Sequence, residues 1–343
     1  MRKLLNSLYI TSPNSYLTRD GENLLVLMPD NNKFRIPIHN IEDVICFGYQ
    51  GASPAAMNFC AERGVGLSFH NEHGKFLARV SGPIKGNVLL RKEQYRIFDS
   101  SDMSLKLAIN CIRAKISNTI VVLQRAIRDH SKKVNVNKIK IVISDLKKIN
   151  SEILNVNNLD SLRGVEGYAA RLYFGVADEL ILNQKKDFFI KTRNKRPPTD
   201  NFNTILSFLY TILAHNMQSA LESVGLDPYI GFMHQIRPGR PALALDMMEE
   251  LRSILVDRTS FSLVNRDQIN KKGFIVKENG SVLMEDDTRK IVLAAWHDKK
   301  QIEIKHPFLN EKIPLGLLPY VQALLLARYI RGDMEIYPNY LSK

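Results

Sequence analysis

Residues 231–252 read GFMHQIRPGRPALALDMMEELR and place one histidine in a basic turn directly ahead of a helix with three acidic residues. On a helical projection the apolar residues share one broad face, while Asp246 and Glu249 fall on the opposite side with Glu250 beside them. Acidic residues on an exposed helix face are common. Taken alone, this stretch therefore favours a solvated amphipathic helix over half of a metal site.

The chain as a whole shows two kinds of apolar pattern. Residues 1–88 contain short alternating runs separated by turn signals such as Asp20-Gly21, which predict strands and hairpins. From about residue 101 to 340 the apolar residues recur with the helical period. We therefore predict an α+β protein with a small, β-rich, sandwich-like N-terminal domain (1–88), a linker (89–100) and a larger all-α domain (101–343).

Two local motifs refine this prediction. The run SPAAMNFCAERG predicts one helix inside the first domain, with Ser53 as its N-cap and Gly64 as its end. The run FIVKENGSVLM predicts a small hairpin within the helical domain. His70 and His73 are three residues apart, and we interpret them as turn residues rather than as a metal pair.

The formal charge of +13 is unevenly distributed. Residues 1–90 hold nine Lys or Arg and seven Asp or Glu, a net of +2, so the remaining residues carry +11. A basic surplus confined to one part of a chain suggests a polyanionic partner, and nucleic acid is the one we favour over solubility alone.

The cysteines and apolar runs bear on the compartment. Cys46, Cys60 and Cys111 are isolated, which argues against a disulfide framework or a structural zinc site and favours the cytoplasm. The first residues lack the features of a signal peptide. The run LGLLPYVQALLLARYI is broken by Pro319 and Gln322, so we predict a buried helix and no membrane partner.

Glu166 lies in SLRGVEGYAARLYF, flanked by Gly164 and Gly167. Small neighbours would let another helix approach and bury the carboxylate, which must then be paired, hydrogen-bonded or metal-bound. Arg163 and Arg171 offer ion-pair partners, so the residues leave a structural and a functional role equally open.

His234 precedes Arg237 and Arg240, whose like charges disfavour an imidazolium and favour a neutral ligand or base. One histidine with two or three carboxylates is an oxygen-rich ligand set, which suits Mg²⁺ or Mn²⁺ better than zinc. A divalent ion beside basic side chains is suited to phosphodiester chemistry. The basic loop RNKRPP, with Arg193 and Arg196, leads into a helix at Thr199 or Asp200, and is either a solvated linker or a phosphate contact.

Three blocks, GVEGYAARLYF, RNKRPPTDNFNTILSFLY and GLDPYIGFMHQIRPGRPALALDMMEELR, occur in this order. In order and spacing they resemble the integrase of CRISPR spacer acquisition, the "Cas-one" family, and the resemblance covers essentially the whole chain. The run PGRPALALDMMEELRSILVDR and the ending RGDMEIYPNYL are most similar to the type I-C branch.

The resemblance implies a metal-dependent DNA integrase and endonuclease. Glu166, His234 and Glu249 match the catalytic residues that bind Mg²⁺ or Mn²⁺, with Glu249 where some members have aspartate. Asp246 matches a further acidic position near the metal, where it would serve catalysis as a supporting ligand or base. The implied reaction is transesterification, in which the 3′-hydroxyl of a short DNA duplex attacks the border of a CRISPR repeat. Implied partners are double-stranded DNA, a second copy of the chain bound through the N-terminal domain, and a small ferredoxin-like companion whose dimer two integrase dimers flank.

Four arginines are candidate phosphate contacts: Arg193, Arg196, Arg237 and Arg240. Glu250 is expected to be a solvated neighbour of the site. Two other functions remain open at this point: a non-catalytic DNA-binding scaffold, in which Glu166 forms a structural ion pair, and a metal-dependent nuclease that acts on structured RNA.

Overall fold

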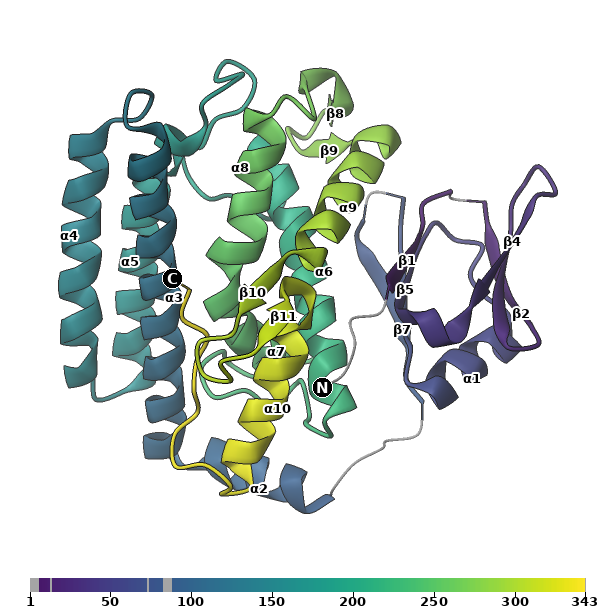
Figure 1. Ribbon diagram of the computed structural model, residues 1–343, viewed down its shortest axis with the longest axis horizontal. Coiled ribbons are helices and arrows are strands. Elements are labelled where there is room, and N and C mark those ends of the chain that lie inside the picture. The colour runs from purple at the N-terminus through teal and green to yellow at the C-terminus, as the bar shows by residue number, and fades with distance from the viewer. Residues whose placement is uncertain (1–5, 13, 73, 83–87, 343) are drawn as a thin grey trace. The chain divides into compact units, whose positions relative to one another are not determined.

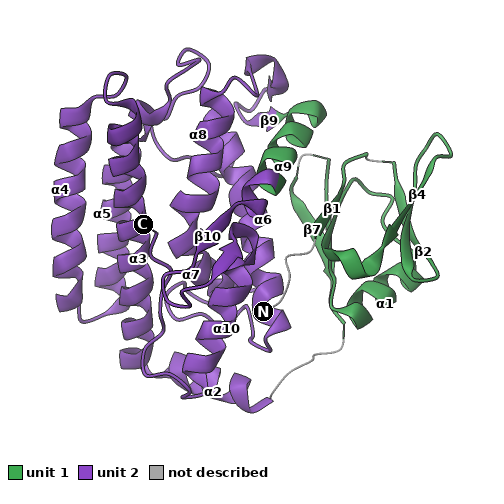
Figure 2. Ribbon diagram, in the orientation of Figure 1, with its two compact units in different colours: residues 1–85, 284–297 green, residues 86–283, 298–343 purple. Residues whose placement is uncertain are grey.

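The computed structural model describes residues 6–12, 14–72, 74–82 and 88–342 (Figure 1). It has the predicted α+β class, with a β-rich N-terminal region followed by a helical one. Its contacts divide the chain into two units, coloured separately in Figure 2. Unit 1 comprises residues 1–85 and 284–297, and unit 2 comprises residues 86–283 and 298–343.

Unit 1 contains two sheets. One is four-stranded, in the order β1 (Asn6–Ile10), β5 (Ile41–Phe47), β6 (Gly66–His70) and β7 (Phe76–Val80). The other is antiparallel and consists of β2 (Tyr16–Asp20), β3 (Asn23–Leu27) and β4 (Lys33–Pro37).

The pairing of these strands was predicted only in part. The β2–β3–β4 meander and the antiparallel β6–β7 pair match the predicted hairpins. The parallel pairing of β1 with β5 and of β5 with β6 was not predicted, because parallel strands need long connections and leave no local turn signal. His70 is buried at the end of β6, with Nδ1 3.2 Å from the Gly74 carbonyl oxygen, whereas His73 lies outside the described residues.

Helix α1 (Pro54–Arg63) packs its apolar side into the core of unit 1. The predicted cap is confirmed: the Ser53 hydroxyl accepts from the Ala56 amide at 3.1 Å, and Gly64 ends the helix in the left-handed conformation. The core is built mainly by Leu17, Leu24, Val44 and Phe59, each almost fully buried.

Unit 2 is mostly helical, with α3, α4 and α5 packed side by side (Figure 1). Its helices are α2 (Val88–Asp99), α3 (Ser101–His130), α4 (Val136–Glu152), α5 (Leu159–Ala177), α6 (Asn201–Ser223), α7 (Ala242–Met248), α8 (Arg258–Asn265) and α10 (Leu318–Ile330), while α9 (Asp286–Gln301) is divided between the units. Residues 89–100, expected as a linker, lie almost wholly in α2, which belongs to unit 2.

Short elements interrupt the helical region. The hairpin of β8 (Phe274–Val276) and β9 (Val282–Met284) was predicted. The antiparallel pair β10 (Glu303–Lys305) and β11 (Lys312–Pro314) was not, because three-residue strands are too short to show a period of two. Short 3₁₀ turns occur at Ile38–Asn40, Ile153–Asn155, Asp178–Leu180, Lys271–Gly273 and Leu315–Leu317.

Helix caps and burial follow the sequence closely. Asn158 caps α5 and Asp200 caps α6, each through its side-chain oxygen. Helix α10 is largely buried, as predicted for the apolar run that contains Pro319. None of the helices in the described part of the chain is long and apolar enough to span a bilayer.

Candidate active site

Residues 242–265 form one continuous helical stretch that changes its winding three times. Helix α7 passes into a 3₁₀ turn, η4 (Glu249–Leu251), then into a π-helical segment, η5 (Arg252–Asp257), and finally into α8. Helices α3, α6 and α10 all pack against this stretch. It is therefore not the half-exposed amphipathic helix that its sequence suggested.

Asp246 is fully buried and holds the turn that carries His234. Its Oδ2 accepts from the backbone amides of Phe232 at 2.7 Å and Met233 at 3.0 Å. Its Oδ1 accepts from the His234 amide at 3.0 Å and lies 2.5 Å from His234 Nδ1. A carboxylate can only accept, so Nδ1 carries the proton of this contact and Nε2 is the ring nitrogen that is left to face a ligand.

Gly231 makes this arrangement possible. A Cβ at that position would lie 2.5 Å from Asp246 Oδ2 and 2.7 Å from the Ala242 carbonyl carbon. Real Cβ atoms do not approach that closely, so a side chain here would push the carboxylate and the N-terminus of α7 apart. The glycine, the turn and Asp246 together fix the orientation of the His234 ring.

Glu249 and Glu166 meet around one ammonium group. Lys115, on α3, forms an ion pair with Glu166 of α5 and another with Glu249, whose Oε2 lies 2.8 Å from Nζ. Arg252 pairs with the other oxygen of Glu249 at 3.0 Å. Elements far apart in sequence thus bring two carboxylates and two cations together.

The charges of this group support one another. Burial opposes the charge of Glu249, but Arg252, Lys115 and His234 outweigh that effect and lower its pKa to about 2. Burial likewise opposes the charge of Lys115, yet the carboxylates of Glu249 and Glu166 raise its pKa above the ordinary value. Both side chains are therefore ionised at neutral pH.

One buried oxygen of this group accepts no hydrogen bond. Glu249 Oε2 is 2.8 Å from Lys115 Nζ, but the contact lacks hydrogen-bond geometry, and no other donor among the described residues reaches the oxygen. In the described part of the chain, no three His, Cys, Asp or Glu side chains converge closely enough to form a complete metal site. The position between the two glutamates is instead held by the Lys115 cation.

The surroundings of Glu166 differ from the prediction. Its side chain is 28% exposed, and a Cβ on Gly164 or Gly167 would meet nothing within 4 Å, so no helix among the described residues packs against these glycines. Arg163 pairs with Asp160 rather than with Glu166. The expected close helix approach is wrong, and the cation that compensates Glu166 comes from α3.

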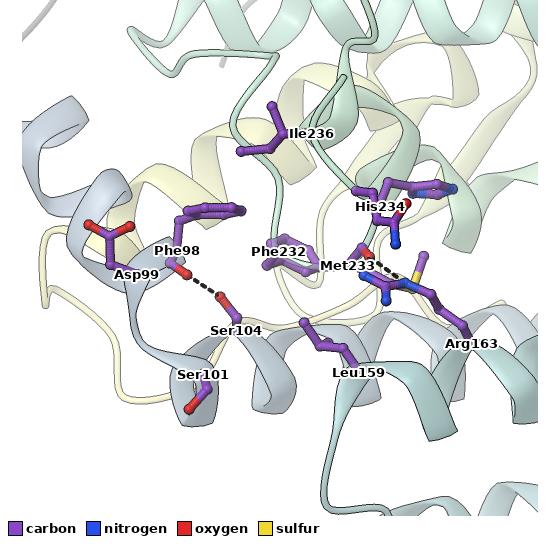
Figure 3. A pocket seen from close by; sticks show the side chains of 11 residues that line it. Phe98, Asp99, Ser101, Ser104, Leu159, Arg163, Phe232, Met233, His234 and Ile236 are labelled. Atoms are coloured by element: carbon purple, nitrogen blue, oxygen red, sulfur yellow. Dashed lines mark hydrogen bonds between the residues drawn. The ribbon is translucent and has the colours of Figure 1, made fainter. Parts of the chain in front are cut away.

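Arg163 also ties α5 to the turn that carries His234. Its Nε and Nη2 donate to the Met233 carbonyl at 3.1 and 2.7 Å. Figure 3 shows this contact beside His234, at one side of an open cavity of about 540 Å³. Phe98 lies on the opposite side in this view. The His234 side chain, 19% exposed, borders this cavity.

The four candidate arginines fall into two classes. Arg196 and Arg237 are exposed, and Arg240 is partly so, which leaves them accessible to a polyanion. Arg193 points into unit 2, where it donates to Asn203 Oδ1 at 2.8 Å and to Ser207 Oγ at 3.0 Å. Arg193 therefore joins the basic loop to α6.

Next to Arg252 lies a cluster of buried polar side chains. Asp257 accepts from the hydroxyls of Tyr173 at 2.9 Å and Tyr210 at 2.5 Å, and the guanidinium of Arg252 lies 5.1 Å from the centre of the Tyr210 ring. The i to i+5 hydrogen bonding of η5 brings Arg252 and Asp257 closer to one face than α-helical winding would. Both side chains consequently reach Tyr210.

Glu250 is fully buried, so its expected solvation is wrong. Its Oε1 accepts from Gln322 at 2.9 Å and Tyr337 at 2.8 Å, and its Oε2 from Asn339 at 2.8 Å and the Tyr340 amide at 2.9 Å. Four donors from the C-terminal part of the chain therefore compensate this carboxylate. They could not be recognised from the sequence, since they lie 72 to 90 residues away.

Lys115 and Arg252 were not predicted from the sequence to belong to the site. Lys115 occurs in NCIRAKISN as one cation on a long amphipathic helix, and no local signal distinguishes it from a surface lysine. Arg252 follows Glu249 by three residues, a spacing that does predict a helical ion pair.

Comparison with known proteins places this chain in a family. The family model described as CRISPR associated protein Cas1 matches residues 8–298. A CRISPR-associated endonuclease Cas1 from Chlorobaculum tepidum is 46% identical over 341 residues, which cover 99% of each chain. A casposase bound to integration product shares the fold, with a TM-score of 0.85 and 21% identity over 98% of this chain and 94% of that one. A chain of a Cas6-RT-Cas1–Cas2 complex matches with a TM-score of 0.82 and 22% identity, over 99% of this chain and 36% of that chain. The chain belongs to the Cas1 family of CRISPR-associated proteins.

Proposed function

We propose that this protein is a metal-dependent DNA integrase and endonuclease of CRISPR adaptation. The observation that carries the proposal is the meeting of Glu166 and Glu249 around one cation, with His234 close enough to act on the charge of Glu249. The names of its relatives, which include endonucleases and a casposase bound to integration product, support the same reaction class.

The residues of the site fit a hard divalent cation. Carboxylate oxygens and one imidazole nitrogen suit Mg²⁺ or Mn²⁺, and Glu249 Oε2 is buried without a hydrogen bond. The group already holds a cation, the Lys115 ammonium, between two carboxylates. We infer that Glu166, Glu249 and His234 Nε2 hold the ion. When bound, it would supply electrostatic stabilisation for charge that develops on phosphodiester oxygens.

The side chains of the chain itself have distinct tasks in the proposed reaction. Asp246 acts as a positioning residue, since its oxygens are occupied by three amides and by His234. The exposed arginines Arg196 and Arg237, with the partly exposed Arg240, bind phosphates of the incoming and target DNA. A 3′-hydroxyl of the duplex loses its proton and forms a new ester with phosphorus, while the bond to the departing 3′-oxygen breaks and that oxygen takes up a proton. One phosphodiester replaces another, so no ATP is consumed.

The proposal extends to partners. We propose that two copies associate through the N-terminal domain and that two such dimers flank a dimer of a small ferredoxin-like protein in the cytoplasm. Support comes from the likeness to a chain whose complex contains Cas1 and Cas2. We assign the chain to the type I-C branch, on the runs PGRPALALDMMEELRSILVDR and RGDMEIYPNYL.

His234→Ala tests the assignment, with His130→Ala as a matched control because His130 is exposed at the end of α3. With Mn²⁺ and the companion protein present, His234→Ala should lower strand transfer by about 100-fold or more, because a ligand or proton-transfer group is lost. DNA binding should persist, and the control should react like wild type.

Three results would contradict this function. Full strand transfer by a folded His234→Ala protein would falsify the site assignment. Failure of the wild-type protein to cut branched DNA, together with no effect of Mn²⁺ on its melting temperature, would favour a DNA-binding scaffold. Preferential cutting of structured RNA would favour a metal-dependent RNA nuclease.

A further inference from the structure

Lys115 occupies the centre of the acidic group rather than its edge. Its side chain is only 16% exposed and comes from α3, opposite the elements that carry Glu166 and Glu249. It is the one residue paired with both carboxylates in the described structure. Its ammonium therefore lies where a cation shared by these two glutamates must lie.

The two cations of the group are held differently. Arg252 pairs with Glu249 Oε1 at 3.0 Å and packs over the Tyr210 ring, which fixes its guanidinium from a second side. Lys115 ends in a flexible chain; it donates a hydrogen bond to Glu166, but its contact with Glu249 Oε2 does not have hydrogen-bond geometry. Of the two, Lys115 is therefore the cation that another ion can replace.

A divalent ion and the ammonium cannot share this position. Both would need the facing oxygens of Glu166 and Glu249, and like charges repel strongly in a buried site of low effective dielectric constant. Without Lys115 or an ion, in contrast, Glu166 would face Glu249 with only the Arg252 guanidinium nearby, on the other oxygen of Glu249, which is unfavourable. The position between the facing oxygens of the two glutamates therefore needs one cation but does not accommodate two.

We propose that Lys115 is an exchangeable internal counter-ion. It holds Glu166 and Glu249 together when no divalent ion is bound, and the ion must displace its ammonium in order to bind. This inference rests on the proposed function, because it takes these glutamates as the metal ligands. Lys115 therefore lowers the affinity of the site for the divalent ion because it competes with the ion, and it does not act as a ligand.

Two substitutions at Lys115 should shift Mn²⁺ affinity in opposite directions. Lys115→Met keeps the length and removes the charge, so Mn²⁺ should bind about tenfold more tightly, a difference of about 1.4 kcal/mol. Lys115→Arg keeps the charge on a planar fork that binds carboxylates bidentately, so Mn²⁺ should bind more weakly than to wild type. Isothermal titration calorimetry of the full chain with MnCl₂ measures both.

Thermal stability gives a readout that is independent of activity. Without Mn²⁺, Lys115→Met should melt about 5 °C or more below wild type, because the carboxylates lose their cation. Added Mn²⁺ should raise its melting temperature by more than it raises that of wild type. Should Lys115→Met not fold, the opposite shift expected of Lys115→Arg still tests the proposal.

Lys195→Met is the matched control. Lys195 is exposed and close enough for Glu249 to affect its charge, but in the described structure it forms an ion pair with neither glutamate. Removing the charge of Lys195 changes the local electrostatic potential but does not free the position between Glu166 and Glu249. The affinity for Mn²⁺ should therefore change by less than about twofold. An equal gain in Lys195→Met and Lys115→Met would show that general electrostatics, not displacement, controls affinity, and would overturn the proposal.

The outcomes also separate this inference from the proposed function. If wild type and Lys115→Met bind Mn²⁺ equally well, and Glu249→Gln abolishes both signals, the metal site stands and the counter-ion role of Lys115 is wrong. If neither protein binds Mn²⁺ in a manner that depends on Glu249, the metal assignment itself fails and the counter-ion role fails with it.

Discussion

Three acidic residues within five positions of one helix have three different environments. Asp246 accepts hydrogen bonds from a turn, Glu249 faces two cations, and Glu250 is enclosed by donors from the C-terminal segment. All three are almost fully buried. Carboxylates at neighbouring positions thus have different roles, which are determined by the elements packed around each of them.

Gly231→Ala tests the contact between the turn and α7. Because the added Cβ would collide with Asp246 Oδ2 and with the α7 backbone, we expect a loss of about 2–4 kcal/mol in the free energy of unfolding. Urea denaturation measures it. Gly164→Ala is the control, since its Cβ enters open space on a helix and should stabilise by roughly 0.5–1 kcal/mol. Equal effects of the two substitutions would refute the steric account.

At this scale the sequence was informative where a family pattern applied and uninformative where contacts are distant. The three blocks brought Glu166, His234 and Glu249 to attention together, and the structure brings Glu166 and Glu249 to one ammonium. Lys115 reaches Glu166 across 51 residues, a separation that no helical period can indicate. Glu250 was misjudged because a helix enclosed on several sides has no solvated face for its acidic residues.

The helical stretch from α7 to α8 connects the site to the C-terminal segment at the scale of elements. Glu250, next to Glu249, accepts four hydrogen bonds, and Asn118 of α3 donates to the carbonyl oxygens of both Glu250 and Tyr340. These hydrogen bonds hold the last described residues against the same turn that carries Glu249. The position of Glu249 thus depends on how the segment after α10 is bound.

Glu250→Gln should weaken the binding of the C-terminal segment to this turn. Each oxygen of Glu250 accepts from two donors, so an amide nitrogen at either position meets N–H or O–H groups and leaves them without acceptors. We expect a loss of about 1–3 kcal/mol in stability and faster amide hydrogen exchange around Tyr340. The exposed Glu278→Gln should change neither. Unchanged exchange at Tyr340 in Glu250→Gln would contradict this role.

The elements themselves were predicted unevenly. Caps and apolar periods identified α1, α5, α6 and α10, because those signals are local. The parallel strands β1 and β5 and the π-helical segment η5 were not predicted, because both depend on partners elsewhere in the chain. Tertiary packing decides such features.

At the scale of the molecule, the basic surplus lies mainly outside residues 1–90. The helical region that carries the site also carries the accessible arginines Arg196 and Arg237. A polyanion bound there would release condensed counter-ions in proportion to the phosphates that are contacted.

DNA affinity should therefore depend steeply on salt. Between roughly 50 and 200 mM NaCl we expect affinity for duplex DNA of unrelated sequence to fall by about 10³-fold or more, measured by fluorescence anisotropy. Arg237→Gln should reduce the slope of the log–log plot by about one. Arg193→Gln, which removes a partly buried residue bound to Asn203 and Ser207, should lower stability and leave the slope intact. A salt-independent affinity would exclude phosphate contacts as the main source of binding.

The π-helical segment η5 has a consequence for insertions and deletions in this gene. A helix with i to i+5 hydrogen bonds holds one residue more per hydrogen-bonded turn than an α-helix. Deleting one residue between Arg252 and Asp257 should therefore let this turn return to α-helical winding, with α8 keeping close to its present orientation. Deleting one residue from α8, which has no such surplus residue, should instead turn every later side chain of that helix by about 100°. The six residues of η5 are thus the part of this helical stretch that best tolerates the loss of one residue.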